Sequence, residues 1–281
     1  MIKIGIIGVG LIGGSMALKL KDQQLTNEVF GIDQNEEHLQ TALKRGIIDK
    51  VSTLEEAIEE ADLLILSIPV DGARKLLPSI LDKIGNNTTV MDVGSTKFGI
   101  TEAVKEHPNR KRYVAFHPMW GTENSGPESA TSESFKGKAG VICNPEQSAD
   151  DALQMVKKVA QNLEMHLIDM NAQDHDIHTA YISHISHITS YALANTVLEK
   201  EREEDTIFQL ASSGFSSTVR LAKSHPEMWV PIFRQNKENV LDVLNEHISQ
   251  LRKFKSALEK ENYEYLEELI RNANKIRGIL K

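Results

Sequence analysis

Three glycines near the start of the chain have the spacing of a phosphate-binding turn. Gly8, Gly10 and Gly13 lie between an apolar segment at 2–7, which predicts a strand, and a segment at 11–21, which predicts a helix. In such a turn the first glycine allows the tight bend, the second lets a pyrophosphate approach the backbone, and the third lets the helix pack closely on the strand. The helix N-terminus then offers unpaired N–H groups to the anion. This context predicts a dinucleotide site.

An acidic residue follows at the distance expected for a contact with the ribose. Asp33 lies 20 residues after Gly13, at the end of the second predicted strand. Its carboxylate can accept hydrogen bonds from the ribose hydroxyls of adenosine and would repel a 2′-phosphate, and no arginine follows it within ten residues. The sequence therefore favours NAD over NADP, the alternative being a fold of this kind that binds nothing or another nucleotide. The cofactor-binding residues that we expect are Gly8, Gly10, Leu11, Ile12, Gly13, Asp33, Ser67 and Pro69.

Two further polar residues follow predicted strands, where open α/β sheets bind their ligands. Ser95 comes after the strand at 88–93. It could contact a ligand, cap the following helix at its N-terminus, or do both. His117 comes after the strand at 113–116, and Pro118 favours an extended backbone at this histidine. A histidine beside a cofactor is suited to acid–base work near neutral pH, although a lone histidine is more often structural. His117 is therefore the candidate base.

Four histidines lie within a predicted helix, which raises the question of a metal site. At about 100° per residue, His184 and His187 share a face, whereas His175 and His184 point in opposite directions. One straight helix does not gather all four with His178, so we predict no metal. We interpret His184 and His187 as a hydrogen-bonding surface or as packed, satisfied side chains.

An arginine and a tryptophan complete the candidates. Arg220 lies where a loop of small residues leads into a helix, and a guanidinium there can hold a carboxylate in bidentate fashion. A surface salt bridge is the alternative for Arg220. Trp229 either lines a pocket or fills the core.

Alternating strands and helices must position these residues. The predicted strands are 2–7, 28–33, 62–68, 88–93, 113–116, 139–143 and 166–168, and the predicted helices among them are 11–21, 35–45, 73–84, 97–106 and 150–163. Such alternation predicts a mostly parallel sheet covered on both faces. The segment 117–138 has no strong period, and a loop of that length is usually functional or mobile.

Strand signals stop at Asn171, and helices are predicted at 172–200, near Asp205 and Ser217, and at 226–259 and 263–280. Five apolar residues of the fourth helix follow a 3–4 spacing: Leu241, Leu244, Ile248, Leu251 and Leu258. Packing within the domain and a dimer interface explain this seam equally well. We predict an α/β fold, with a Rossmann-type domain at 1–168 followed by an all-α domain at 169–281.

Composition narrows the classes of protein. The 281 residues are 40% hydrophobic and carry a net charge of −8, which argues against a disordered chain and against a nucleic-acid partner. No apolar run approaches the roughly 20 residues of a membrane span. The single cysteine excludes an intramolecular disulfide. Because Lys3 lies inside the first apolar run, we interpret that run as a strand and not a signal peptide, and we expect a cytoplasmic protein.

Together these motifs resemble the prephenate dehydrogenases of tyrosine biosynthesis, a family that includes arogenate dehydrogenases, over nearly the whole chain. Beyond the glycine turn with Asp33, the resemblance rests on Gly-Ser95, His117-Pro-x-x-Gly-Thr122-Glu123-x-Ser-Gly, Ser-His184-x-x-His187, Gly-Phe-x-x-x-x-Arg220-x-Ala-Lys-Ser, Met-Trp229 and Asn-Lys-Glu-Asn239. It implies oxidative decarboxylation of prephenate to 4-hydroxyphenylpyruvate with CO₂ and NADH, in an enzyme that forms a homodimer through its C-terminal helices.

The resemblance also implies roles for single residues. His117 would take the proton of the ring hydroxyl with help from Ser95, and Arg220 would hold a carboxylate. The side-chain end of the substrate would contact His187, Thr122 and Trp229, while His184 and Glu123 would lie behind the site or gate it. Because prephenate is a dianion, this acidic protein must supply positive charge locally, which we expect from Arg220 together with the histidines.

One departure separates this chain from its relatives, which often carry a lysine and an aspartate shortly before the arginine. Ser216 and Ser217 stand there, so the partners for an ionic gate with Glu123 are missing. Three alternatives remain: an arogenate dehydrogenase, a β-hydroxyacid dehydrogenase and a NAD-sensing protein without catalysis. The His184–His187 motif disfavours the second, and the presence of His117, Ser95 and Arg220 together disfavours the third.

Overall fold

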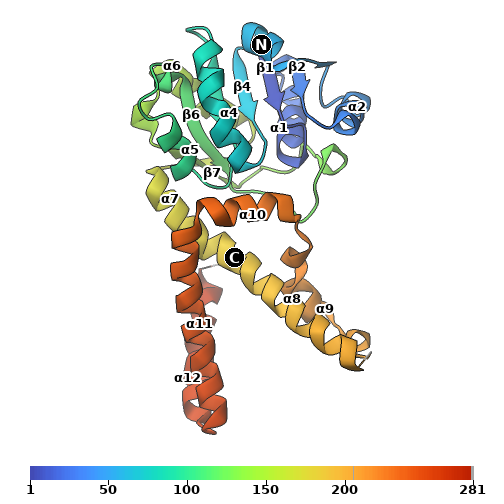
Figure 1. The fold of residues 1–281 in the computed structure, drawn as a ribbon, viewed down its shortest axis with the longest axis vertical. Helices are drawn as coiled ribbons and strands as arrows, with labels where there is room; N and C mark the ends of the chain where they lie inside the picture. Colours follow the sequence, from blue (N-terminus) through green and yellow to red (C-terminus); the bar gives the residue numbers. More distant parts are fainter. Residues whose placement is uncertain (205, 280–281) are drawn as a thin grey trace. The chain divides into compact units, whose positions relative to one another are not determined.

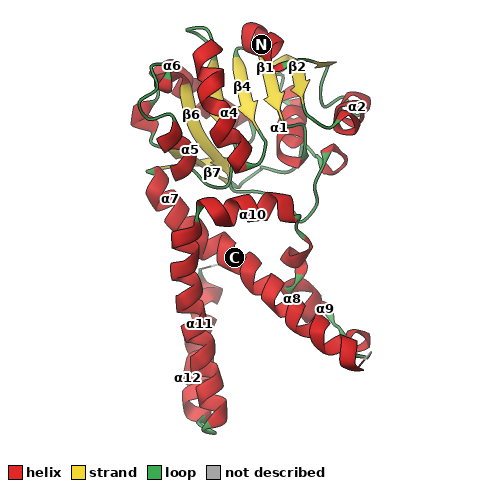
Figure 2. Cartoon of the chain, viewed as in Figure 1, coloured by secondary structure: helices red, strands yellow, loops and turns green. Residues whose placement is uncertain are grey.

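The computed structural model describes residues 1–204 and 206–279, and the chain divides into two compact units, 1–236 and a second that begins at Lys237. The first unit holds an eight-stranded sheet with helices on both faces (Figure 1). The second unit is helical (Figure 2). Among the described residues, no helix is both long and apolar enough to cross a membrane.

The sheet confirms the predicted fold class. Its strands are β1 (Ile2–Ile7), β2 (Thr26–Ile32), β3 (Lys50–Val51), β4 (Leu63–Leu66), β5 (Thr89–Asp92), β6 (Tyr113–Pro118), β7 (Ala139–Cys143) and β8 (His166–Met170). They lie in the order β3-β2-β1-β4-β5-β6-β7-β8, and only the β6–β7 pair is antiparallel among the described strands. The order of the first six strands is that of dinucleotide-binding folds, in which ligands lie beyond the carboxyl ends of the strands.

Two buried layers hold the sheet between its helices. Along β4, Leu63 and Ile65 face one layer and Leu64 and Leu66 face the other, as the two-residue period of a strand requires. One layer contains side chains of α1 (Leu11–Asp22), α2 (Glu36–Lys44) and α6 (Asp150–Asn162). The other contains side chains of α3 (Leu54–Glu60), α4 (Val70–Lys83) and α5 (Phe98–Ala103). Both faces of β4 are therefore completely apolar, which explains its continuous hydrophobic sequence.

Two elements of this unit lay outside the predictions. The strand β3 has only two residues and gives no periodic signal. The helix α3 starts with a capping box, in which the Thr53 hydroxyl accepts from the Glu56 backbone N–H at 3.2 Å and the Glu56 carboxylate accepts from the Thr53 N–H at 3.1 Å. That Thr-x-x-Glu pattern was a readable start signal.

The predicted helix at 172–200 is interrupted. It consists of α7 (Ala172–Thr179), a π turn (Ala180–His184) and α8 (Ile185–Glu204). A π turn widens the helix and changes the direction of every side chain that follows it. The expectation that His175 and His184 point in opposite directions assumed one straight helix, and that assumption is wrong. Both side chains are buried, and the charge of His175 acts on His184.

The rest of the first unit runs through a 3-10 turn at Ile207–Leu210, α9 (Ser213–Thr218), a 3-10 turn at Arg220–Lys223 and α10 (Pro226–Gln235). Asp205, near which a short helix was predicted, lies outside the described residues. Helix α10 ends at Gln235, so the predicted helix at 226–259 is two helices. Arg234 and Gln235 donate to the Asp71 carboxylate of α4, each at 2.8 Å, which ties α10 to the sheet domain.

The second unit consists of α11 (Lys237–Glu259), α12 (Tyr263–Ala273) and a 3-10 turn at Asn274–Gly278. Leu280, the predicted end of the last helix, lies outside the described residues. Four members of the apolar seam on α11 are exposed in the single chain: Leu241, Ile248, Leu251 and Leu258. Packing within the second unit therefore does not bury these four side chains.

Candidate active site

The glycine turn after β1 has the geometry that its sequence predicts. Gly8 has a φ of +96°, and a Cβ there would lie 2.3 Å from the backbone oxygen of Ser67. A Cβ on Gly13 would lie 2.4 Å from the backbone oxygen of Gly8. Both positions therefore require glycine, because any side chain would push apart the turn, α1 and the end of β4.

Gly10 has the opposite environment, which fits a ligand. A Cβ on Gly10 would meet no described atom within 4 Å, so open space adjoins the backbone at the start of α1. Among the described residues, no side chain caps this helix at Gly10, so no capping side chain uses the N–H groups of its first turn at Leu11 and Ile12. A tight turn, an open backbone approach and a helix N-terminus together fit a pyrophosphate.

Asp33 lies beside this turn, at the end of β2. Its Oδ2 accepts from the Val9 backbone N–H at 3.0 Å and its Oδ1 from that of Asn35 at 2.9 Å. Its side chain keeps 15% of its surface exposed, which leaves room for a ribose. Ser67 and Pro69 follow β4 at the same edge of the sheet. The residues at this edge therefore fit the adenosine and pyrophosphate of a dinucleotide.

His117, the candidate base, lies near the end of β6 and is half-buried. Its Nδ1 lies 2.8 Å from Nε2 of His175 on α7. The other ring nitrogen of His175, Nδ1, lies 2.8 Å from Oδ1 of Asp176. Because His175 and Asp176 are almost completely buried, His117 is the exposed end of a chain of three polar side chains.

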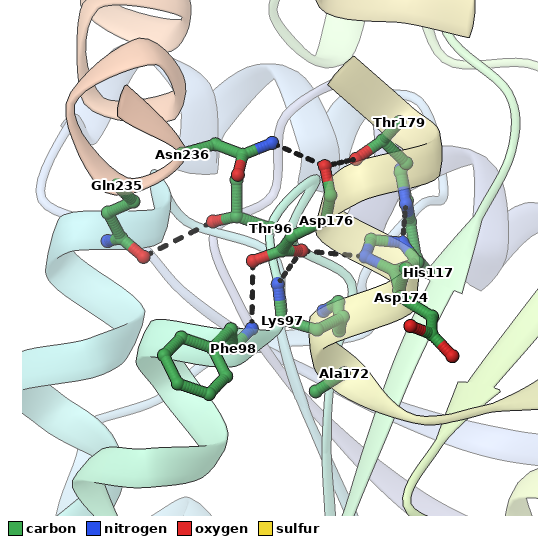
Figure 3. A network of polar contacts seen from close by, with 12 residues as sticks. Thr96, Lys97, Phe98, His117, Ala172, Asp174, Asp176, Thr179, Gln235 and Asn236 are labelled. Atoms are coloured by element: carbon green, nitrogen blue, oxygen red, sulfur yellow. Dashed lines mark hydrogen bonds and ion pairs between the residues drawn. The ribbon is translucent and has the colours of Figure 1, made fainter. Parts of the chain in front are cut away.

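Asp176 fixes that chain to the turn after β5. Its carboxylate accepts from the backbone N–H groups of Lys97 at 2.7 Å and Phe98 at 3.0 Å, at the start of α5 (Figure 3). Asp176 therefore caps α5, and Ser95 is not its N-cap. Ser95 is half-buried in the same turn, and its hydroxyl makes no hydrogen bond to the part of the chain that the structure describes.

A buried ion pair lies beneath this turn. The Lys97 ammonium pairs with the Asp92 carboxylate, which also accepts from the Tyr113 hydroxyl at 2.6 Å and from the Gly94 N–H at 2.9 Å. Burial, then the charge of Asp92, raises the pKa of Tyr113 well above its usual value, so Tyr113 remains a donor. We interpret this network as support for the end of β5, since all three side chains are fully buried.

A second set of contacts joins the histidines after the π turn to α10. Both N–H groups of the Asn236 amide are used: one donates to the Asp176 backbone oxygen at 2.6 Å, and the other lies 3.1 Å from Nδ1 of His184. His187 stacks on Trp229 with ring centroids 3.4 Å apart. Trp229 is 6% exposed, so its side chain packs in the core, and one face of its ring contacts His187.

The site histidines are neutral at pH 7. Burial, followed by the charges of His175, Lys97 and His184, holds the pKa of His117 well below its usual value. Burial also lowers the pKa of His184 to about 4 and lowers the pKa values of His175 and His187. The expectation that the histidines add positive charge is therefore wrong for the free protein, because their desolvation favours the uncharged form.

Arg220 supplies positive charge at the surface of this cluster. Its guanidinium donates to the Glu123 carboxylate at 2.7 Å, and its side chain is 50% exposed. Ser216 and Ser217 are exposed and do not reach Glu123; the Ser217 hydroxyl donates to the Gly214 backbone oxygen at 2.9 Å. Glu123 thus pairs with the arginine itself. The neighbouring Thr122 hydroxyl accepts from the Asn124 N–H at 3.2 Å.

The structure gathers most of the predicted residues at one edge of the sheet and adds some that were missed. The predicted His117, His184, His187 and Trp229 are joined through His175, Asp176 and Asn236, which received no role from the sequence. His178 is exposed on α7. Within the described ranges 1–204 and 206–279, no group of three or more histidine, cysteine or acidic side chains is arranged to hold a metal ion.

Comparison with known proteins agrees with this arrangement. The model of the prephenate dehydrogenase nucleotide-binding domain matches residues 16–169, and that of the prephenate dehydrogenase dimerization domain matches residues 171–272. The prephenate dehydrogenase of Bacillus subtilis is 32% identical over 97% of this chain and 74% of its own length. The cyclohexadienyl dehydrogenase of Zymomonas mobilis is 28% identical over 99% of this chain and 96% of its own.

A solved structure gives the same result. The prephenate dehydrogenase of A. aeolicus, in complex with hydroxyphenyl propionate and NAD⁺, has a TM-score of 0.89 and 29% identity to this chain. That match covers 100% of this chain and 99% of the other. With both family models and a relative that is 32% identical over 97% of this chain in agreement, the chain belongs to the prephenate dehydrogenase family.

Proposed function

We propose that this protein is a NAD-dependent prephenate dehydrogenase of tyrosine biosynthesis. It oxidatively decarboxylates prephenate to 4-hydroxyphenylpyruvate and CO₂. The observation that carries the proposal is His117, a neutral, half-buried histidine at the carboxyl end of β6, on the same edge of the sheet as the Gly8–Gly13 turn. A base beside a dinucleotide is what oxidation of a hydroxyl requires.

His117 takes the proton of the ring hydroxyl through Nε2, and Ser95 assists at the same oxygen. When bound, NAD accepts the hydride from the carbon that bears this hydroxyl. Loss of the ring carboxylate as CO₂ leaves its electron pair in the ring, which becomes aromatic, and the phenolate oxygen regains the proton held by His117. Aromatisation drives the reaction, so the protein mainly positions its substrates and moves one proton.

Arg220 holds a carboxylate of the substrate. Because it is the charged partner of Glu123 in the free protein, the substrate carboxylate replaces Glu123 when it binds. His187, Thr122 and Trp229 contact the side-chain end, with His184 behind them. These histidines act as neutral hydrogen-bonding groups, which leaves charge recognition to Arg220.

The turn at Gly8, Gly10, Leu11, Ile12 and Gly13 would hold the pyrophosphate of NAD, with Asp33 at the adenosine ribose and Ser67 and Pro69 beside it at the end of β4. Residues 1–168 form the NAD-binding domain and residues 169–281 the substrate and dimerisation domain. The exposed seam on α11 supports a homodimer through the C-terminal helices, because such apolar rows on a long helix are buried by a partner helix. We place the enzyme in the cytoplasm.

Arogenate dehydrogenase is the second candidate function. The full-length similarity to a protein named cyclohexadienyl dehydrogenase favours it, as does the chemistry, because arogenate differs from prephenate only by an amino group in place of the keto oxygen. His187 and Thr122, which we place at the side-chain end of the substrate, can each accept or donate a hydrogen bond, so they suit either an amino group or a keto oxygen.

NADH formation with prephenate, with arogenate and with a panel of 3-hydroxy acids tests the proposal. We expect turnover with prephenate and none with the hydroxy acids. Turnover with arogenate alone would assign the second candidate. No turnover with either cyclohexadienyl substrate would overturn both.

A further inference from the structure

The hydrogen-bonded chain behind His117 determines which of its nitrogens is free. We propose that His175 is a positioning residue which, held by Asp176, keeps the proton of His117 on Nδ1 and so keeps Nε2 available as the base. The inference rests on the proposed function, in which His117 takes a proton from the substrate.

The direction of the chain follows from its acceptor end. An ionised carboxylate has no proton to give, so Nδ1 of His175, at 2.8 Å from the Asp176 oxygen, must be the donor. A neutral imidazole has one N–H, so Nε2 of His175 is an acceptor. The nitrogen that faces it at 2.8 Å, Nδ1 of His117, must therefore donate. The single proton of neutral His117 is then on Nδ1, and Nε2 carries the lone pair.

Asp176 cannot turn away from His175. Its carboxylate accepts from two backbone N–H groups at the start of α5, those of Lys97 and Phe98. Its own backbone oxygen accepts from the Asn236 amide at 2.6 Å and from the Thr179 hydroxyl at 3.2 Å (Figure 3). The side chain is fixed from α5 and its backbone from α7 and the end of α10. The acceptor end of the chain is therefore rigid.

The same chain stabilises the proton that the reaction transfers. When Nε2 of His117 takes a proton, its Nδ1–H becomes the donor of a cation, and its acceptor His175 is backed by a carboxylate. The other charged group near the ring is Lys97, which raises the cost of that cation but is paired with Asp92, while His184 is neutral. A charged His175 would repel this cation, but the pKa of His175 is lowered by burial, and neutral His175, hydrogen-bonded to Asp176, accepts from the protonated ring.

A purely structural role for His175 makes different predictions. His175 is 1% exposed, so its ring also fills space in the core, and any substitution removes some packing contacts. Packing alone does not select a tautomer of His117, nor does it distinguish a replacement that accepts a hydrogen bond from one of similar size that does not. The tautomer and the acceptor are therefore what the experiments must measure.

The first experiment reads the tautomer of the free wild-type protein by long-range ¹H–¹⁵N NMR with ¹⁵N-labelled histidine. The signals of His117 are assigned as those lost in His117→Asn. We expect a protonated Nδ1 and a bare Nε2 on His117. A proton on Nε2 of neutral His117 would overturn the inference. This readout does not depend on turnover, so it stands even where the proposed substrate fails.

The second experiment compares His175→Gln with His175→Leu. The glutamine oxygen can accept from the Nδ1–H of His117 while its amide donates to Asp176, whereas leucine does neither. We expect kcat with prephenate to fall by less than about 10-fold for glutamine and by about 10²-fold for leucine, with KM and NAD affinity within about 3-fold of wild type.

A matched control and a stability measurement complete this test. His178→Leu changes an exposed histidine on the same helix and should leave kcat unchanged. Equal losses of kcat in the glutamine and leucine variants at equal melting temperatures would overturn the positioning role, as would a leucine variant with wild-type kcat. Absence of turnover by the wild type contradicts the proposed function and leaves the NMR result as the test.

Discussion

The cofactor turn and the helical wall of the site hold their functional groups in opposite ways. At 8–13 the backbone itself forms the binding surface, and contacts that leave no room for a Cβ determine the positions of Gly8 and Gly13. In the helical wall formed by α7, the π turn and α10, side chains from segments far apart in the sequence hold one another in place through hydrogen bonds. His117 and His175 are 58 residues apart, and Asp176 and Lys97 are 79 apart. One region is specified locally and the other only by the fold.

This difference separates binding from chemistry. A turn made of backbone recognises a group that every dinucleotide carries, and it needs no proton on any side chain. A chain of side chains can hold a proton at one chosen atom and stabilise it there when it moves. Changes in the turn should therefore alter cofactor affinity, and changes in the wall should alter turnover. Each of the following predictions tests one side of that division.

The largest effect is expected at the base. His117→Asn keeps a side chain that can hydrogen-bond but cannot take a proton, so we expect kcat with prephenate to fall by about 10²–10⁴-fold. NAD affinity, measured by calorimetry, should stay within about 3-fold, because the glycine turn is untouched. His166→Asn, at an exposed histidine on β8, is the matched control. A wild-type kcat in His117→Asn would remove this residue from catalysis.

The next effect is expected at the ribose contact. Asp33→Ala removes charge-assisted hydrogen bonds of about 1.5–3 kcal/mol each, so NAD affinity should fall by about 10–100-fold. Discrimination against NADP should also relax, since the charge that repels a 2′-phosphate is gone. Glu37→Ala, an exposed residue in the first turn of α2, controls for loss of charge. An unaltered preference for NAD would mean that Asp33 does not contact the ribose.

These two sites also differ in how far the sequence could predict them. The glycines and Asp33 form a short pattern whose conformational demands are local, and the sheet followed from periods of two and 3.6 residues. The His175–Asp176 pair on α7 can be read in the sequence, but its partner is His117 on strand β6, 58 residues away. The positions of His184 and His187 also depend on the π turn at Ala180–His184, for which we can identify no sequence signal. Local chemistry was predictable, whereas contacts that the fold creates were not.

The pH dependence tests the wall without any mutation. His117 acts as a base only when neutral, and burial with its charged neighbours lowers its pKa well below 6.5. As pH falls, the neutral form persists past pH 6.5 and is lost only on passing the lowered pKa. We therefore expect kcat/KM to change by less than about 2-fold between pH 7.5 and 6.0, where an unperturbed histidine would lose about three-quarters of its neutral form, a change of about 4-fold. An acid limb centred near pH 6.5 would contradict the buried environment.

Among the substitutions, the smallest effect is expected at the Glu123–Arg220 ion pair, which lies near His187. Glu123→Gln releases Arg220 from its 2.7 Å partner, so the substrate carboxylate no longer competes with Glu123. The Arg220 side chain is half-exposed, and exposed pairs contribute about 0.2–1 kcal/mol, so KM for prephenate should fall by at most about 5-fold with kcat unchanged. Glu133→Gln, an exposed residue of the same 117–138 segment, removes an equal charge without touching Arg220. A higher KM in Glu123→Gln alone would show that Glu123 binds the substrate itself, and the competition between two carboxylates for one arginine would then be wrong.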